Sequence, residues 1–261
     1  MNLINRILGR AQPKENAEGM IHYKPIYSNE PGRFTVFIDS RVVDFLHEAV
    51  GLKFSDLEKL PEVVYQKCIE LGFEHGSDTH LLVELDHSRN AQASMKIGKF
   101  QIPMPVGNVL VTHSVIIYAD EIIFELKKLQ SEIMFLMPKN FKPTNIDLAR
   151  AGREKVLMGI SHEFVHMFAT DEHSSLMPSL GLELLELLTD SINFDLHFMN
   201  YEKESSVVQF GFADGIAYLT NLVRRKHGIK DPAIHLKFMK EQSKEIIHDC
   251  NYRLNGNGNH L

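Results

Sequence analysis

The sequence predicts an α+β protein, in which an N-terminal lobe with a mixed β-sheet and helices is followed by an all-helical C-terminal lobe. Segments rich in β-branched and aromatic residues occur in the first 120 of the 261 residues, and helical patterns dominate from there on. Pro138 and Pro143 mark a connector between the two patterns. We therefore expect lobes at residues 1–140 and 141–261, which form two parts of one domain.

Four segments of the first lobe read as strands of one sheet. Each is bounded by Gly, Pro, Asn or Asp. They lie at residues 33–39, 79–86, 95–103 and 109–118. The last of them is a candidate edge strand, along which an extended peptide would pair.

The helical elements are predicted from their start and stop signals. Between the first two strands lies a helical stretch that Pro61 interrupts, with Ser55 and Glu58 at capping-box spacing and Gly72 as its stop. Thr144 and Asp147 have the same spacing before a long run to about residue 170. The remaining helices are expected at residues 120–137, 180–199, 213–227 and 232–254, the last with Asp231 as its N-cap.

Composition and charge exclude several classes of function. The formal net charge is −6 and no long basic run occurs, which argues against nucleic acid as a partner. Only two cysteines, Cys68 and Cys250, are present, so we expect buried, reduced thiols and no disulfide framework.

No segment approaches the roughly 20 apolar residues of a membrane-spanning helix. The apolar stretches of residues 1–10 are too short for the core of a signal peptide, although a short amphipathic anchor is an alternative interpretation. A cytoplasmic location is the default expectation, and export by a specialised secretion system stays open.

The pentapeptide HEFVH carries the strongest chemical signal. His162 and His166 are four residues apart on a predicted helix, so both imidazoles project from one face and can reach one metal ion. Glu163 lies beside the first histidine. Such spacing is typical of a zinc site.

A second segment, GLELLELLTD, supplies carboxylates in a helix that is apolar nearly all round. Catalytic zinc takes three protein ligands and one water, and Glu186 completes a His, His, Glu set. Asp190, one turn further on, can accept the second ring N–H of a ligating histidine. Glu183 is an alternative ligand, but only Glu186 has an acid four residues on.

Together, HEFVH and LELLTD resemble the gluzincins, the thermolysin-like clan of HExxH zinc metallopeptidases. The match covers roughly residues 144–195. It implies a zincin-like fold with the active-site cleft between the lobes, zinc ligands His162, His166 and Glu186, and Glu163 as the general base. It also implies that Asp190 orients His162.

The sequence lacks the GxMEN motif of the aminopeptidase branch and the tyrosine that thermolysin carries between its motif helix and its glutamate. The donor that stabilises the oxyanion must therefore come from elsewhere. Tyr218, His227, His235 and Tyr252 are candidates, and Tyr218 is favoured because it lies in the predicted helix directly after the ligand helix.

Several other residues have ordinary structural interpretations. His173 is expected in a loop in solvent, although it could line the cleft. His113 is expected as a hydrogen-bonded core histidine. The basic run Arg224, Arg225 and Lys226 is expected to end a helix, where cations interact favourably with the helix dipole.

These observations predict a zinc-dependent metallopeptidase, a hydrolase whose partner is a peptide or protein substrate. Two alternatives stay open. One is another HExxH enzyme, such as a deformylase-like amidase or a cytoplasmic regulatory protease of the ImmA/IrrE kind; the deformylase form expects an upstream cysteine ligand that neither cysteine here provides. The other is a non-catalytic peptide-binding or partner-binding protein of inactive-peptidase type. The sequence leaves the oligomeric state open.

Overall fold

A computed structural model describes residues 23–28, 34–73, 79–87, 93–104, 107–138, 142–169, 180–228 and 235–256. The chain divides into two compact units. The sheet unit consists of Met1–Glu62 and Gly76–Gln130, and the helical unit of Val63–His75 and Ser131–Leu261. The predicted α+β class is confirmed, and so is its order of a mixed sheet followed by helices.

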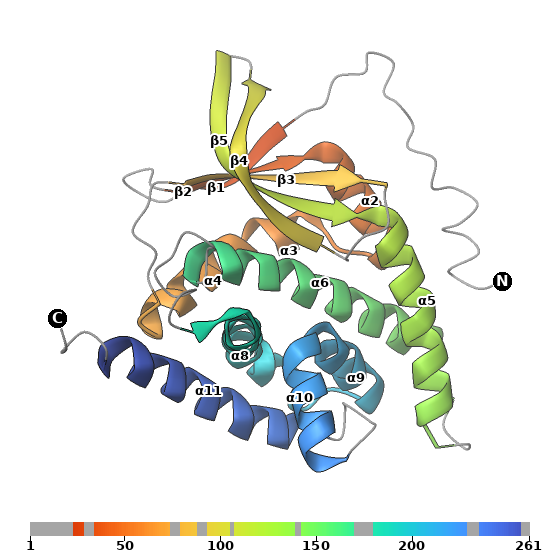
Figure 1. Ribbon diagram of the computed structural model, residues 1–261. Helices are drawn as coiled ribbons and strands as arrows, with labels where there is room; N and C mark the ends of the chain where they lie inside the picture. Colours follow the sequence, from red (N-terminus) through yellow and green to blue (C-terminus); the bar gives the residue numbers. More distant parts are fainter. Residues whose placement is uncertain are drawn as a thin grey trace. The chain divides into compact units, whose positions relative to one another are not determined.

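The sheet unit is built on five strands in the order β1-β2-β3-β5-β4 (Figure 1). They are β1 (Tyr23–Ser28), β2 (Phe34–Asp39), β3 (Thr79–Asp86), β4 (Ala93–Met104) and β5 (Gly107–Tyr118). The inner pairs β2·β3 and β3·β5 are parallel, and the outer pairs β1·β2 and β4·β5 are antiparallel. The sheet is therefore mixed, as predicted, and β1 is a strand that the sequence did not reveal.

The edge prediction for residues 109–118 is wrong. Strand β5 lies inside the sheet, because His113–Tyr118 pair with β3 on one side while the strand also pairs with β4 on the other. Its buried side chains, among them Val115 and Ile117 at 0% exposure, fit this inner position. Strands β1 and β4 form the edges of the described sheet.

Helices α2 (Ser40–Val50), α3 (Phe54–Glu58) and α4 (Leu60–Glu70) connect β2 to β3. The capping box predicted at Ser55 and Glu58 is wrong: the Lys53 backbone N–H donates to the Asp56 carboxylate at 2.8 Å, so α3 begins earlier. Gly72 ends α4 as predicted, with a left-handed φ of 80° that favours glycine.

The described part of the helical unit contains most of α4, the end of α5 (Ala119–Leu136) and five further helices. These are α6 (Asn145–Ala169), α8 (Leu182–Tyr201), α9 (Ser206–Gly215), α10 (Ala217–His227) and α11 (Leu236–Gly256). In Figure 1, α8 is seen nearly along its axis, with α6 on one side of it and α11 on the other.

The start of α6 is the one predicted. The Thr144 hydroxyl accepts from the Asp147 backbone N–H at 3.1 Å, and the Thr144 N–H points to the Asp147 carboxylate. Residues 213–227, predicted as one helix, are instead divided between α9 and α10, with a break at Ile216. The predicted N-cap Asp231 and the N-terminal residues 1–10 lie outside the described residues.

Helices α6 and α9 pack closely through glycine. A Cβ added at Gly211 would lie 2.2 Å from the Ala151 carbonyl oxygen, and one added at Gly215 would lie 2.7 Å from the Met158 Cβ. These contacts require glycine, because any side chain would push α9 away from α6.

Both cysteines are buried and free, as predicted. Burial raises the pKa of Cys68 to about 12 and that of Cys250 to about 11, which makes both thiols poor nucleophiles. Among the helices that the structure describes, none is long and apolar enough to cross a membrane.

Candidate metal centre

Helices α6 and α8 run antiparallel and are joined by polar contacts at successive turns. The Asn193 side chain donates to the Met158 carbonyl at 2.9 Å, His162 contacts Asp190, and His166 contacts Glu186. Glu186, Asp190 and Asn193 recur at intervals of three or four residues, so these three side chains of α8 lie along the side that faces α6. The sequence periodicity thus places every predicted ligand at this one interface.

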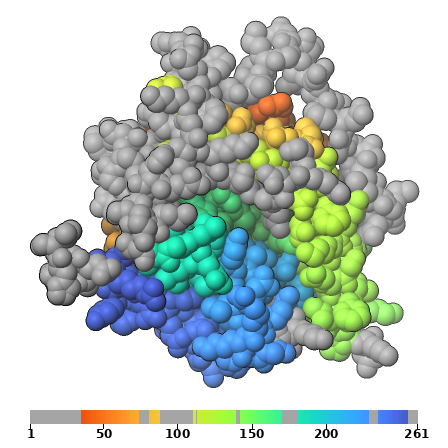
Figure 2. All heavy atoms as spheres, in the orientation of Figure 1, coloured from red at the N-terminus to blue at the C-terminus, as the bar shows by residue number. Residues whose placement is uncertain are grey.

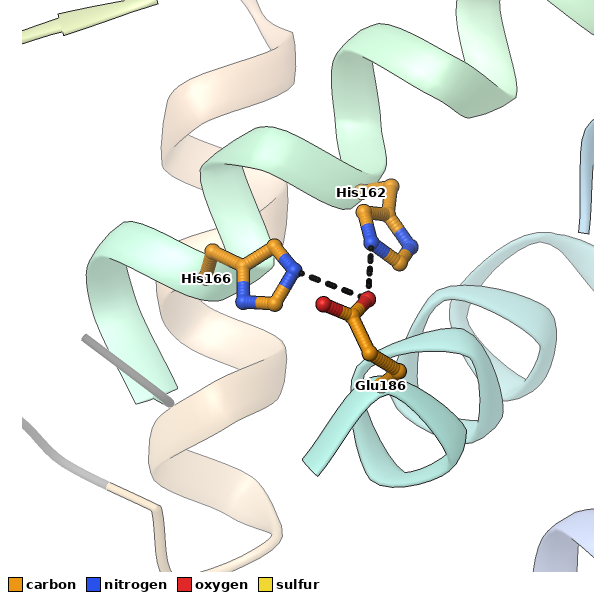
Figure 3. Close-up of side chains that lie close together, drawn as sticks. All are labelled: His162, His166 and Glu186. Carbon is orange, nitrogen blue, oxygen red and sulfur yellow. Dashed lines mark hydrogen bonds and ion pairs between the residues drawn. The ribbon is translucent and has the colours of Figure 1, made fainter. Parts of the chain in front are cut away.

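His162, His166 and Glu186 form a three-residue cluster, named here the metal cluster. Figure 3 shows both imidazoles projecting from α6 toward the same carboxylate oxygen on α8. The Nε2 atoms of His162 and His166 lie 3.1 and 3.3 Å from Glu186 Oε2. The three side chains are 12 to 17% exposed, so solvent still reaches the cluster.

The donor set fits zinc. Two imidazole nitrogens and one carboxylate oxygen are ligands that zinc takes, and they leave a fourth position for water. Bonds of about 2.0–2.1 Å in a tetrahedron place two ligand atoms about 3.3 Å apart. The N–O distances of 3.1 and 3.3 Å lie close to this value.

Asp190 fixes the orientation of His162. Its Oδ1 lies 2.7 Å from His162 Nδ1, and its side chain is only 1% exposed. A carboxylate accepts, so Nδ1 carries the proton and Nε2 is the atom directed toward the metal cluster. This is the arrangement that the sequence predicted for Asp190.

Asp190 also binds the N-terminus of α10, which the sequence did not reveal. The backbone N–H groups of Tyr218 and Leu219 donate to Asp190 Oδ2 at 2.6 and 2.9 Å. The N-cap residue of α10 is Ile216, whose side chain has no acceptor, so α8 supplies the cap. No local signal in the sequence indicated this contact, because Ile216 lies inside the segment predicted as one helix.

Without a metal, the cluster holds a proton. Burial lowers the pKa of His162, but hydrogen bonds to Asp190 and Glu186 and the charge of Asp190 outweigh it and raise that pKa to about 10. Burial raises the pKa of Glu186, but hydrogen bonds to His162 and His166 outweigh it and hold that pKa well below its usual range. In the metal-free protein, His162 is therefore an imidazolium held between the Asp190 and Glu186 carboxylates.

Glu163 and Tyr218 lie beside the metal cluster. Glu163 directly follows His162 in α6. Against the effect of burial, hydrogen bonds to Asp190 and Glu186 raise the pKa of His162. Burial raises the pKa of Tyr218, and the negative charge of Glu163 adds a smaller part to each rise. The Tyr218 ring stacks on His162 with a centroid distance of 6.2 Å and an interplanar angle of 13°. Figure 2 shows α8 and α10 side by side on the surface, and Tyr218 is 46% exposed.

The sequence favours Tyr218 as the oxyanion donor because it predicts this residue in the helix directly after the ligand helix. That placement is wrong, although Tyr218 does lie beside the metal cluster. Helix α9, not α10, follows the ligand helix directly. Tyr218 reaches the cluster because α10 begins against Asp190.

The other candidates lie elsewhere in the described part of the chain. Glu183 is 76% exposed and pairs with Arg225 at 3.5 Å, so it does not replace Glu186. His227 and His235 both contact the Phe238 ring, and Tyr252 is 73% exposed on α11.

His113 is buried within β5, as expected for a core histidine. The basic run from Arg224 to Lys226 forms the last turn of α10, as predicted. His173 lies outside the described residues.

A second contact behind the cluster was not foreseen. The Ser161 hydroxyl, next to His162 in the chain, lies 3.0 Å from His197 Nε2 on α8, and both side chains are buried. Burial lowers the pKa of His197 to about 4, so this imidazole is neutral near pH 7.

Comparisons of the chain with models of protein families, with curated proteins and with solved structures find no match. The function of the site is therefore inferred from its residues and their geometry.

Proposed function

We propose that the protein is a zinc-dependent metallopeptidase that hydrolyses peptide bonds with water. The observation that carries the proposal is the convergence of both histidines of HEFVH on the Glu186 carboxylate, with Asp190 behind His162. A purely structural zinc needs no base, whereas Glu163 adjoins this cluster.

His162, His166 and Glu186 would hold the zinc ion, which when bound would lower the pKa of water from about 15.7 toward 7 and polarise the scissile carbonyl. Asp190 keeps the proton of His162 on Nδ1, so that Nε2 faces the ion.

Glu163 moves the proton. Its carboxylate accepts a proton from the attacking water and then delivers it to the departing amine nitrogen, which allows the peptide bond to break. It directly follows the proposed ligand His162 in α6.

Tyr218 is the donor proposed for the developing oxyanion. Burial, followed by the charges of Glu186, Asp190 and Glu163, raises the pKa of its hydroxyl, so the group stays protonated and able to donate. Its partial exposure leaves the hydroxyl within reach of a bound substrate.

The proposal is tested by measuring cleavage of a fluorogenic peptide library with zinc and with a chelator. We expect cleavage that the chelator abolishes and added zinc restores. Glu163→Gln is expected to bind zinc and fold like the parent while kcat falls by about 100-fold or more, because general base catalysis is lost.

Glu183→Gln is the matched control, since Glu183 is an exposed glutamate of the neighbouring helix. It should cleave like the parent. Zinc binding without cleavage of any library member would instead support the non-catalytic binding protein, and parental turnover by Glu163→Gln would remove Glu163 as the base.

A further inference from the structure

A buried ion pair lies on the same helix as the metal cluster but outside it. Lys155 Nζ on α6 contacts Asp214 Oδ2 on α9 at 2.6 Å, and the two side chains are 3% and 18% exposed. Lys155 precedes His162 by seven residues, which places both on one face of α6.

Stability alone does not account for this pair. Taking an ammonium and a carboxylate out of water is costly, and apolar side chains of similar size often stabilise such a position as well or better. A buried pair of this kind has a clearer use where it fixes one particular arrangement of two helices, and here these helices are α6 and α9.

Asp214 lies at the end of α9, directly before the start of α10. The next residue, Gly215, packs so closely on α6 that an added Cβ would lie 2.9 Å from the Lys155 carbonyl oxygen. Ile216 then breaks the helix, and α10 begins at Ala217. Lys155 therefore holds the α9–α10 junction against α6 by a side-chain contact and by a backbone contact.

The same junction determines where Asp190 is held. The first backbone N–H groups of α10, at Tyr218 and Leu219, both donate to Asp190 Oδ2, while Oδ1 orients His162. A shift of the junction would move these donors, and with them the carboxylate that sets the His162 ring.

We propose that Lys155 and Asp214 are positioning residues for the metal centre: their ion pair fixes the α9–α10 junction, whose N–H groups hold Asp190 and so orient His162. This inference rests on the proposed metal site. It predicts that the pair affects how tightly and in what geometry the cluster binds metal, although neither residue is a ligand.

The test compares zinc affinity, measured by competition with a chromophoric chelator, for the parent and for Lys155→Met and Asp214→Asn. We expect zinc affinity to fall by about 10-fold in each variant, at the low end of the range for changes behind metal ligands. The visible absorption bands of bound Co²⁺ should also change in intensity, which a loss of stability alone would not cause.

Gly215→Ala probes the same junction without changing a charge. Its Cβ would lie 2.7 Å from the Met158 Cβ and displace the end of α9, so zinc affinity should fall here too. Arg150→Met is the matched control. Arg150 is also a cation on α6 and forms an ion pair with Glu204 at 2.7 Å, but Glu204 is not part of the α9–α10 junction. It should bind zinc and Co²⁺ like the parent.

Parental zinc affinity and Co²⁺ spectra in Lys155→Met and Asp214→Asn would overturn the positioning role and leave the proposed function intact. If Lys155→Met does not fold, Asp214→Asn and Gly215→Ala decide by the same criteria. A parent protein that binds no zinc would overturn the proposed function itself, which is a separate outcome.

Discussion

At the scale of single residues, Asp190 connects the metal cluster to the start of α10. One carboxylate oxygen orients His162 and the other caps α10 through two backbone N–H groups. An ionised side chain suits both contacts, since each partner donates. Loss of its charge should therefore affect metal binding and helix stability together.

Asp190→Asn is expected to weaken zinc binding by about 10 to 100-fold. It should also lower the free energy of unfolding of the metal-free protein by roughly 1–2 kcal/mol, because a neutral amide loses the charge-assisted hydrogen bonds to the Tyr218 and Leu219 N–H groups and the favourable interaction with the dipole of α10. Chelator competition and denaturant unfolding measure the two effects. Asp195, on the same helix as Asp190, pairs with Lys67 and provides the control. Asp195→Asn should leave zinc affinity unchanged. Parental zinc affinity in Asp190→Asn would separate Asp190 from the metal centre.

Tyr218→Phe tests the oxyanion donor. The phenyl ring keeps the stacking on His162 and the backbone N–H keeps its bond to Asp190, so zinc affinity and stability should be those of the parent. We expect kcat to fall by about 100-fold, since one hydrogen-bond donor to the transition state is lost. Steady-state kinetics measure this, with the exposed Tyr252→Phe as the control. An unchanged kcat would mean that another group serves the oxyanion.

At the scale of the elements, the predictable features are those encoded locally. The Thr144 and Asp147 spacing located the start of α6, and Gly72 located the end of α4. Helix α9 was missed because its segment is apolar on nearly every side, which removes the periodicity that reveals a surface helix.

The buried contact between Ser161 of α6 and His197 of α8 predicts that the free energy of unfolding depends on pH. The pKa of His197 is about 4 in the folded protein and about 6.5 when unfolded, so the unfolded chain takes up a proton first as the pH falls. The stabilising effect of a neutral His197 is complete above pH 6.5 and is lost as the pH falls toward 4. The loss amounts to about 3 kcal/mol.

The measurement compares denaturant unfolding of metal-free parent and His197→Gln between pH 7 and pH 4. The parent should lose about 3 kcal/mol more than the variant across this range. His248→Gln, at an exposed histidine of α11, should follow the parent. Equal pH profiles for parent and His197→Gln would contradict the buried, neutral state of His197.

At the scale of the whole molecule, the sequence predicted the fold class and the metal cluster but not the sheet order. Helical spacing places His162 and His166 on one face, whereas Glu186, on another helix, was predicted because catalytic zinc takes a third protein ligand and because the segment resembles the gluzincins. The inner position of β5 was not predicted, because strand order depends on pairings between distant segments such as β3 and β5. For the same reason, the capping of α10 by Asp190 was not foreseen.

The same limit applies to the units of the chain. The boundary predicted at residue 140 follows the change from strand patterns to helix patterns in the sequence. In the folded chain, contacts between residues instead group Val63–His75 with the helical unit. Contacts of this segment explain why: Lys67 pairs with Asp195 on α8 at 2.6 Å, and Tyr65 packs against Phe168 of α6. Such tertiary contacts cannot be predicted from the local hydrophobic periodicity of the sequence.

The central claim is that α6 and α8 together bind one zinc ion and leave one ligand position for water. It is tested most directly by anomalous scattering at the zinc edge from crystals grown with zinc. The account predicts one strong peak about 2.0–2.2 Å from His162 Nε2, His166 Nε2 and a Glu186 carboxylate oxygen, absent in His162→Ala. No peak at these three side chains, or a peak elsewhere with the three turned apart, would contradict it.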